Sequence, residues 1–181
     1  MRRALAIWLV VVACSFAVAA QEYPKDKVFG GFQYTSFDAF NIQHVNLLGW
    51  NAQFTHYLNK PFGITGEVTG SYGSPTVGGI GVSLPTYTFM FGPTMRAPLE
   101  KSTPFVHALF GAAHMSNTKG IYSSTGFALA LGGGWDVKIG RNIDWRVVQV
   151  DYLATRLQDP TGTGTPQQEN FRFATGIVYK F

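Results

Sequence analysis

The sequence predicts an all-β fold, an eight-stranded antiparallel up-and-down β-barrel that crosses a membrane. Charged residues make up only 13% of the chain, about half the usual share of a soluble domain, while aromatic residues reach 15%. Apolar and polar side chains alternate over segments of about ten residues, which is the pattern of membrane strands. After residue 20, no apolar run approaches the roughly 18 residues of a transmembrane helix.

The first 20 residues are predicted to be a secretory signal peptide. Arg2 and Arg3 precede an apolar run at 4–13, and small residues at 17–20 supply a cleavage site after Ala19 or Ala20. A second route stays open, because the residues ending in Cys14 resemble the site at which bacterial lipoproteins are cut and acylated. The expected organisation is a signal peptide at 1–20, a short periplasmic segment at 21–27 and a barrel at 28–181.

Loss of the signal peptide changes what the composition says about partners. The remaining chain has no Cys, which excludes disulfides and thiol chemistry there. The formal net charge of +4 falls by two when Arg2 and Arg3 leave. The sequence contains no Lys/Arg run of the kind that binds phosphate backbones. We therefore expect no nucleic-acid partner.

The first four segments of the barrel alternate with a period of two. In the second, Trp50 and Phe54 lie on one face, and Asn51 and Gln53 lie on the other. In the fourth, aromatic residues alternate with Thr. The four expected strands are 28–37, 46–58, 62–72 and 84–97.

The last four segments vary more in clarity. The fifth is the least clear, because both of its faces are mostly apolar or small. The sixth is the clearest, with Phe127, Leu129 and Leu131 opposite Ala128 and Ala130. The four expected strands are 104–115, 126–139, 143–157 and 170–181.

The connections alternate in length as well. Those after the second, fourth and sixth segments are short, whereas those after the third, fifth and seventh are longer and polar. Outer-membrane barrels have short periplasmic turns and longer outside loops. Eight strands leave an interior about wide enough for side chains to fill. We therefore expect a packed, polar inner face that includes Gln33, Asn51, Gln53 and Gln149.

The end of the chain carries the most specific signal. Phe181 is the last residue, Tyr179 is an aromatic residue two positions earlier, and Ile177 continues the alternation. This end resembles the terminal strand of bacterial outer-membrane proteins, which the barrel-assembly machinery reads. Over residues 28–181 the pattern resembles the eight-stranded transmembrane domain of the OmpA-like family, most closely at Asp151-Tyr152 and at the terminal strand. The resemblance is one of architecture more than of a dense motif.

The resemblance implies several properties. It implies an outer-membrane location, contact with outer-membrane lipid, periplasmic chaperones as assembly partners, no cofactor and a monomeric state. It also implies a charged cluster in the lumen, with Glu67 and Asp151 near mid-membrane and sharing basic partners. Arg172 is expected toward the outside. The predicted cluster comprises Glu67, Asp151, Gln53, Gln149, Arg96, Arg172, Asp136 and Lys180. Of these, Arg96, Asp136 and Lys180 are expected toward the periplasmic end, together with Lys138.

Several functions remain open at this point. A structural barrel that supports the envelope or displays loops is expected first, and a narrow ion channel and a secreted lipocalin-type lipid-binding barrel are the alternatives. The four His residues lack metal-ligand spacing, so no metal site is expected. No motif supports a catalytic pair in His114 with Ser116 or in His44 with Asp38, so no enzymatic activity is expected.

Overall fold

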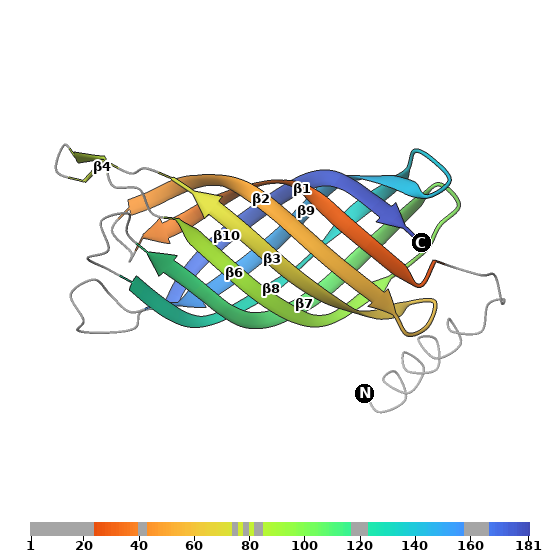
Figure 1. Cartoon of the computed structure of the whole chain (residues 1–181), viewed down its shortest axis with the longest axis horizontal. Coiled ribbons are helices and arrows are strands. Elements are labelled where there is room, and N and C mark those ends of the chain that lie inside the picture. Colours follow the sequence, from red (N-terminus) through yellow and green to blue (C-terminus); the bar gives the residue numbers. More distant parts are fainter. Residues whose placement is uncertain are drawn as a thin grey trace, which may run out of the picture.

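The computed structural model describes residues 24–39, 43–73, 76–77, 80–81, 85–116, 123–157 and 167–181. These residues form a closed barrel with a small hairpin beside one end (Figure 1). Within these ranges no helix is long and apolar enough to cross a membrane. The strands are β1 (Asp26–Ala39), β2 (Gln43–Tyr57), β3 (Phe62–Tyr72), β4 (Thr76–Val77), β5 (Ile80–Gly81), β6 (Thr86–Arg96), β7 (Ser102–Ser116), β8 (Ser123–Lys138), β9 (Ile143–Arg156) and β10 (Gln167–Lys180).

The barrel is antiparallel throughout, in the order β1-β10-β9-β8-β7-β6-β3-β2. The first and last strands close it, with Lys27 opposite Lys180 and Ser36 opposite Phe171. Because β3 pairs directly with β6, the hairpin β4–β5 lies outside the barrel. The predicted fold, an eight-stranded up-and-down barrel, is thus confirmed.

The two ends of the barrel differ in their connections. We call the end with the short β2–β3, β6–β7 and β8–β9 connections the turn end, and the opposite end the loop end. The described chain begins and ends at the turn end (Figure 1). In outer-membrane barrels the short turns face the periplasm. The predictions of a signal peptide and of processing at Cys14 concern residues outside the described ranges.

Several strands are longer than the sequence indicated. β1 begins at Asp26 rather than at residue 28, and β2 begins at Gln43 rather than at residue 46. Backbone pairing continues through polar residues that do not show alternation. The longer connection expected after β3 includes the two-residue strands of the β4–β5 hairpin.

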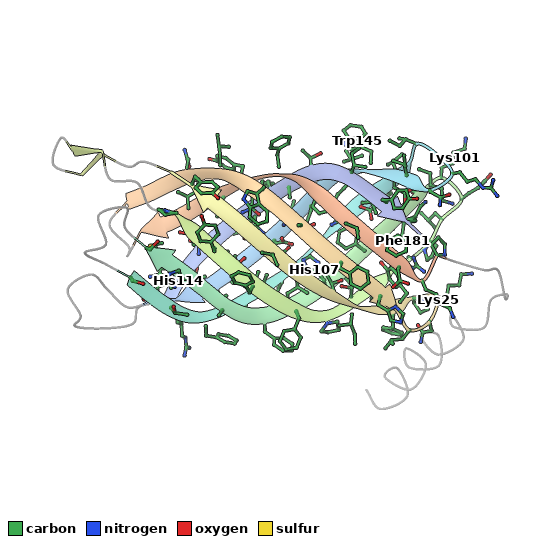
Figure 2. All side chains as sticks on the ribbon, viewed as in Figure 1. Lys25, Lys101, His107, His114, Trp145 and Phe181 are labelled. Carbon is green, nitrogen blue, oxygen red and sulfur yellow. The ribbon has the colours of Figure 1, made fainter. Side chains whose placement is uncertain are left out.

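The outer surface of the barrel is apolar and rich in aromatic residues. Phe32 is 80% exposed, and side chains such as Phe54, Phe89 and Phe127 also point outward. Figure 2 shows many side chains projecting outward from the barrel wall. The lipocalin alternative is wrong, because it requires the apolar faces of the strands to point inward.

The interior is less uniformly polar than predicted. One apolar cluster includes Leu47 on β2, Leu109 and Met115 on β7, and Leu157 just after β9. A second contains Phe29, Ala174 and Val178. The ambiguous fifth segment explains much of this difference, because β7 points large apolar side chains inward. Polar and charged side chains therefore occupy only part of the lumen.

Candidate functional site in the barrel lumen

Two groups of charged side chains meet inside the barrel. We call Glu67, His107, Asp151 and Arg172 the central group, and Lys27, Asp136 and Arg146 the turn-end group. Two glutamines join them. The lumen network therefore comprises Lys27, Gln53, Glu67, His107, Asp136, Arg146, Gln149, Asp151 and Arg172, and all of these residues are buried.

In the central group, one guanidinium joins two carboxylates. Arg172 Nη2 lies 2.7 Å from Glu67 Oε1 and 2.6 Å from Asp151 Oδ2. Arg172 Nε also donates to Asp151 Oδ2 at 2.9 Å. His107 Nε2 lies 2.8 Å from Asp151 Oδ1. Because β3 and β10 are not neighbours in the barrel, the contact between Glu67 and Arg172 spans the lumen.

A glycine makes room for this arrangement. Gly132 on β8 is paired with Asp151 on β9. A Cβ atom at Gly132 would collide with the Asp151 carboxylate and with the backbone of Val150. Gly132 thus lets the Asp151 side chain lie against the barrel wall.

In the turn-end group, one carboxylate joins two cations. Asp136 Oδ2 lies 3.1 Å from Lys27 Nζ, and Asp136 Oδ1 accepts a hydrogen bond from Arg146 Nε at 2.7 Å. The Arg146 guanidinium carbon lies 4.2 Å from the ring centroids of both Phe29 and Phe105. Aromatic faces attract a guanidinium through their quadrupole. The two rings therefore stabilise Arg146, which shares the Asp136 carboxylate with Lys27.

Gln53 and Gln149 connect the two groups. Arg146 Nη1 donates to the side-chain oxygens of both glutamines at 2.7 Å. Gln53 Nε2 donates to Glu67 Oε2 at 2.6 Å, and Gln149 Nε2 donates to Asp151 Oδ2 at 2.8 Å. The cations Lys27, Arg146 and Arg172 balance the three carboxylates of the network. Such compensation is required, because an unpaired buried charge is costly.

A β-bulge in β9 brings Arg146 into the lumen. Trp135 pairs with Val148, but the next residue of β8 pairs with Arg146, so Val147 is extra. Both Val147 and Val148 point outward. A bulge adds one residue to one strand and redirects the side chains beyond it. Strict alternation from Gln149 predicts that Arg146 points toward lipid, and for this reason the sequence did not reveal its place in the lumen.

Lys27 and His107 were also missed. Lys27 shares the inward face of β1 with Gln33 and Thr35, so extending the alternation by one step would have found it. His107 lies on β7, where the sequence did not distinguish the faces; Figure 2 places it near the middle of the barrel.

The other predicted cluster residues lie elsewhere. Arg96 is at the turn end, where Nε donates to the Lys60 carbonyl at 2.9 Å and the guanidinium lies 3.4 Å from the Tyr57 ring centroid. Lys180 forms an ion pair of 2.5 Å with Asp144. Arg172 was expected outward of Glu67 and Asp151, and that placement is wrong, because it contacts both carboxylates.

The terminal residues lie on the outer surface at the turn end. Ile177, Tyr179 and Phe181 are all exposed. The Phe181 backbone exchanges hydrogen bonds with Asp26, at 3.1 and 3.3 Å. The last residue therefore helps to close the barrel, while its side chain stays accessible.

Two described histidine side chains, His56 and His114, lie outside the lumen, and His56 Nδ1 lies 2.7 Å from Asp26 Oδ1. His114 Nδ1 lies 2.8 Å from Thr125 Oγ1, near the loop end (Figure 2). No group of three potential metal ligands occurs among the described residues. The side chains of His44 and Asp38 lie outside the described part.

A closed antiparallel barrel with an apolar outer surface and a charged interior is the architecture of a bacterial outer-membrane protein. The chain belongs to the family of the outer membrane protein beta-barrel domain, whose family model matches residues 6–181. This membership assigns the chain to the bacterial outer membrane, and it confirms the predicted family resemblance.

Solved structures agree on the fold. Neisserial surface protein A shares 10% identity at a TM-score of 0.67, over 89% of this chain and 100% of its own. Ail, the attachment invasion locus protein of Yersinia pestis, shares 17% identity at 0.58, over 88% and 100%. OprG from Pseudomonas aeruginosa shares 12% identity at 0.52, over 90% and 98%. A comparison with curated proteins found no match.

Proposed function

We propose that this protein is a non-conducting outer-membrane barrel that supports the envelope or presents its surface loops to partners. The observation that carries the proposal is the bridge from Glu67 through Arg172 to Asp151, whose side chains are at most 1% exposed. A bridge across the lumen blocks the path that a pore would need.

The surface role draws on the neighbouring structures. Two of them are named for attachment and invasion and for the bacterial surface. The same eight-stranded scaffold with long connections at one end suits loop display. Loops on a rigid scaffold are where binding residues concentrate. We propose no enzymatic activity.

A narrow ion path is the second candidate. His107 Nδ1, Arg172 Nη1 and Asn51 Oδ1 are buried and have no hydrogen-bond partner among the described residues. Such atoms favour contact with water or with a passing ion. In that case the bridge at Arg172 would act as a gate rather than as a permanent plug.

Single-channel recording in planar bilayers separates the two candidates. Wild-type protein, shown to be folded by its heat-dependent shift on a detergent gel, is expected to give no stable conductance steps. Arg172→Ala is expected to give steps, because it removes the bridge and leaves two carboxylates in the lumen. Regular steps from the wild type would favour the channel and contradict the closed barrel.

Export and assembly form a separate part of the proposal. We propose that a signal peptide is removed after Ala19 or Ala20 and that periplasmic chaperones deliver the chain. The barrel-assembly machinery then recognises Ile177, Tyr179 and Phe181, and the folded protein is a monomer. The exposed terminal side chains support this. Phe181→Ala should lower the folded protein in the outer membrane several-fold, whereas Phe127→Ala should not. Mass spectrometry of the mature protein would locate the cleavage site or reveal a lipid on Cys14.

A further inference from the structure

The same two-residue pattern occurs at each of the three short turns. A large exposed apolar side chain is followed, two positions later, by a basic residue. The exposed fractions of the apolar members are 66% for Leu58, 52% for Leu99 and 59% for Ile139. We call the three pairs the turn pairs: Leu58 with Lys60, Leu99 with Lys101, and Ile139 with Arg141.

The turn pairs lie next to the apolar outer wall. Lys25, Lys101, Trp145 and Phe181 all lie at the turn end (Figure 2). Trp145 and Phe181 are exposed on the outer surface. Aromatic residues at this level are typical of the boundary between hydrocarbon and headgroups. The basic members of the turn pairs therefore lie near the depth of the phosphate groups.

The charge of the turn end is asymmetric. Apart from the lumen network, its carboxylates among the described side chains are Asp26, Glu100 and Asp144, and two of them are already engaged, Asp144 by Lys180 and Asp26 by His56. The cations at this end outnumber them: Lys25, Lys60, Arg96, Lys101, Lys138, Arg141 and Lys180. At the loop end, the charged side chains that the structure describes are Arg156 and Glu169, one of each sign.

We propose that the turn pairs form a ring of contacts that selects anionic phospholipids in the periplasmic leaflet. Each apolar member enters the edge of the hydrocarbon, and each basic member reaches a headgroup phosphate along its flexible stem. Basic residues near an anionic membrane surface contribute about 1 kcal/mol each. A hydrophilic cell-wall polymer would satisfy the cations but would leave the three apolar side chains uncovered, so the lipid surface fits better.

Spin-labelled lipids test this inference with the whole barrel in phosphatidylcholine vesicles. The fraction of label immobilised by the protein gives the preference for phosphatidylglycerol over phosphatidylcholine. We expect the wild type to prefer the anionic lipid by up to about fivefold at a contacted site. The combined variant Lys60→Gln, Lys101→Gln and Arg141→Gln should lower the ratio toward one. As a matched pair of single changes, Lys101→Gln should lower it and Arg156→Gln at the loop end should not.

Several outcomes would overturn the proposal. The wild type could show no preference, or the combined variant could keep the full preference. The combined variant could also keep the lipid preference but lose binding to purified peptidoglycan, which would assign the ring to the cell wall. If the heat-shift gel shows that the variant does not fold, the wild type alone tests the proposal. About 1 M NaCl should reduce its preference for the anionic lipid, because salt screens exposed charges. A preference insensitive to salt would contradict the ring.

Discussion

The two charged groups of the lumen have opposite imbalances between carboxylates and cations. The central group has two carboxylates around one guanidinium, whereas the turn-end group has two cations around one carboxylate. Aromatic rings stabilise the excess cation of the turn-end group. The face of a ring attracts a cation but not a carboxylate, so rings cannot stabilise the excess carboxylate of the central group in this way. The central group therefore depends on a single side chain, Arg172, while the turn-end group distributes its stabilisation.

Arg172→Met should have the largest effect. It removes the shared partner and leaves Glu67 and Asp151 buried together, with only His107 and amide groups beside them. Breaking a buried ion pair in this way costs about 3–5 kcal/mol. Urea unfolding of the barrel in phospholipid vesicles measures the loss. Arg172→Lys should restore part of the lost unfolding free energy. A loss below about 1 kcal/mol for Arg172→Met would contradict the proposed dependence of the central group on Arg172.

Asp136→Asn should cost less, about 3 kcal/mol at most, near the lower end for a broken buried pair. Arg146 keeps both glutamine oxygens and both aromatic rings, and Lys27 Nζ stays 4.9 Å from the Phe105 ring centroid. The same unfolding assay gives the value. A greater loss for Asp136→Asn than for Arg172→Met would reverse the proposed order of dependence.

Phe105→Leu tests the aromatic contribution. It removes one of the two rings beside Arg146, and a desolvated cation–π contact contributes about 2 kcal/mol. We expect a loss of that order in the unfolding free energy. Phe127→Leu makes the same chemical change on the outer surface and is the matched control. Equal losses for the two variants would mean that the rings act only through apolar packing.

Arg156→Gln should have the smallest effect. Arg156 is exposed at the loop end of β9, and substitutions at such positions change stability by about 0.5 kcal/mol or less. The variant calibrates the unfolding assay for the loss of a cation that no buried carboxylate needs. A loss comparable to that of Asp136→Asn would show that the assay responds to net charge rather than to the lumen network.

Much of the fold followed from alternation. The period of two assigned eight strands and pointed Gln53, Glu67, Gln149 and Asp151 to the same side of the wall. The ends of the strands were less predictable, because backbone pairing extends through residues such as Asp26 and Gln43 that carry no apolar pattern.

The lumen network was only partly predictable, for two physical reasons. The bulge in β9 lies between two similar residues, Val147 and Val148, so the sequence does not reveal where the alternation shifts or that Arg146 turns inward. The level of Arg172 depends on the register between strands, which pairs it with Asp151. Neither the bulge nor the register leaves a local mark in the chain.

A double-mutant cycle between Glu67 and Arg172 tests the central claim most directly. Their strands are not neighbours, so the two side chains can couple only across the lumen. We expect Glu67→Gln to offset part of the loss caused by Arg172→Met, with a coupling energy above about 1 kcal/mol in the vesicle unfolding assay. Additive losses, within about 0.5 kcal/mol, would mean that the charged bridge does not span the barrel.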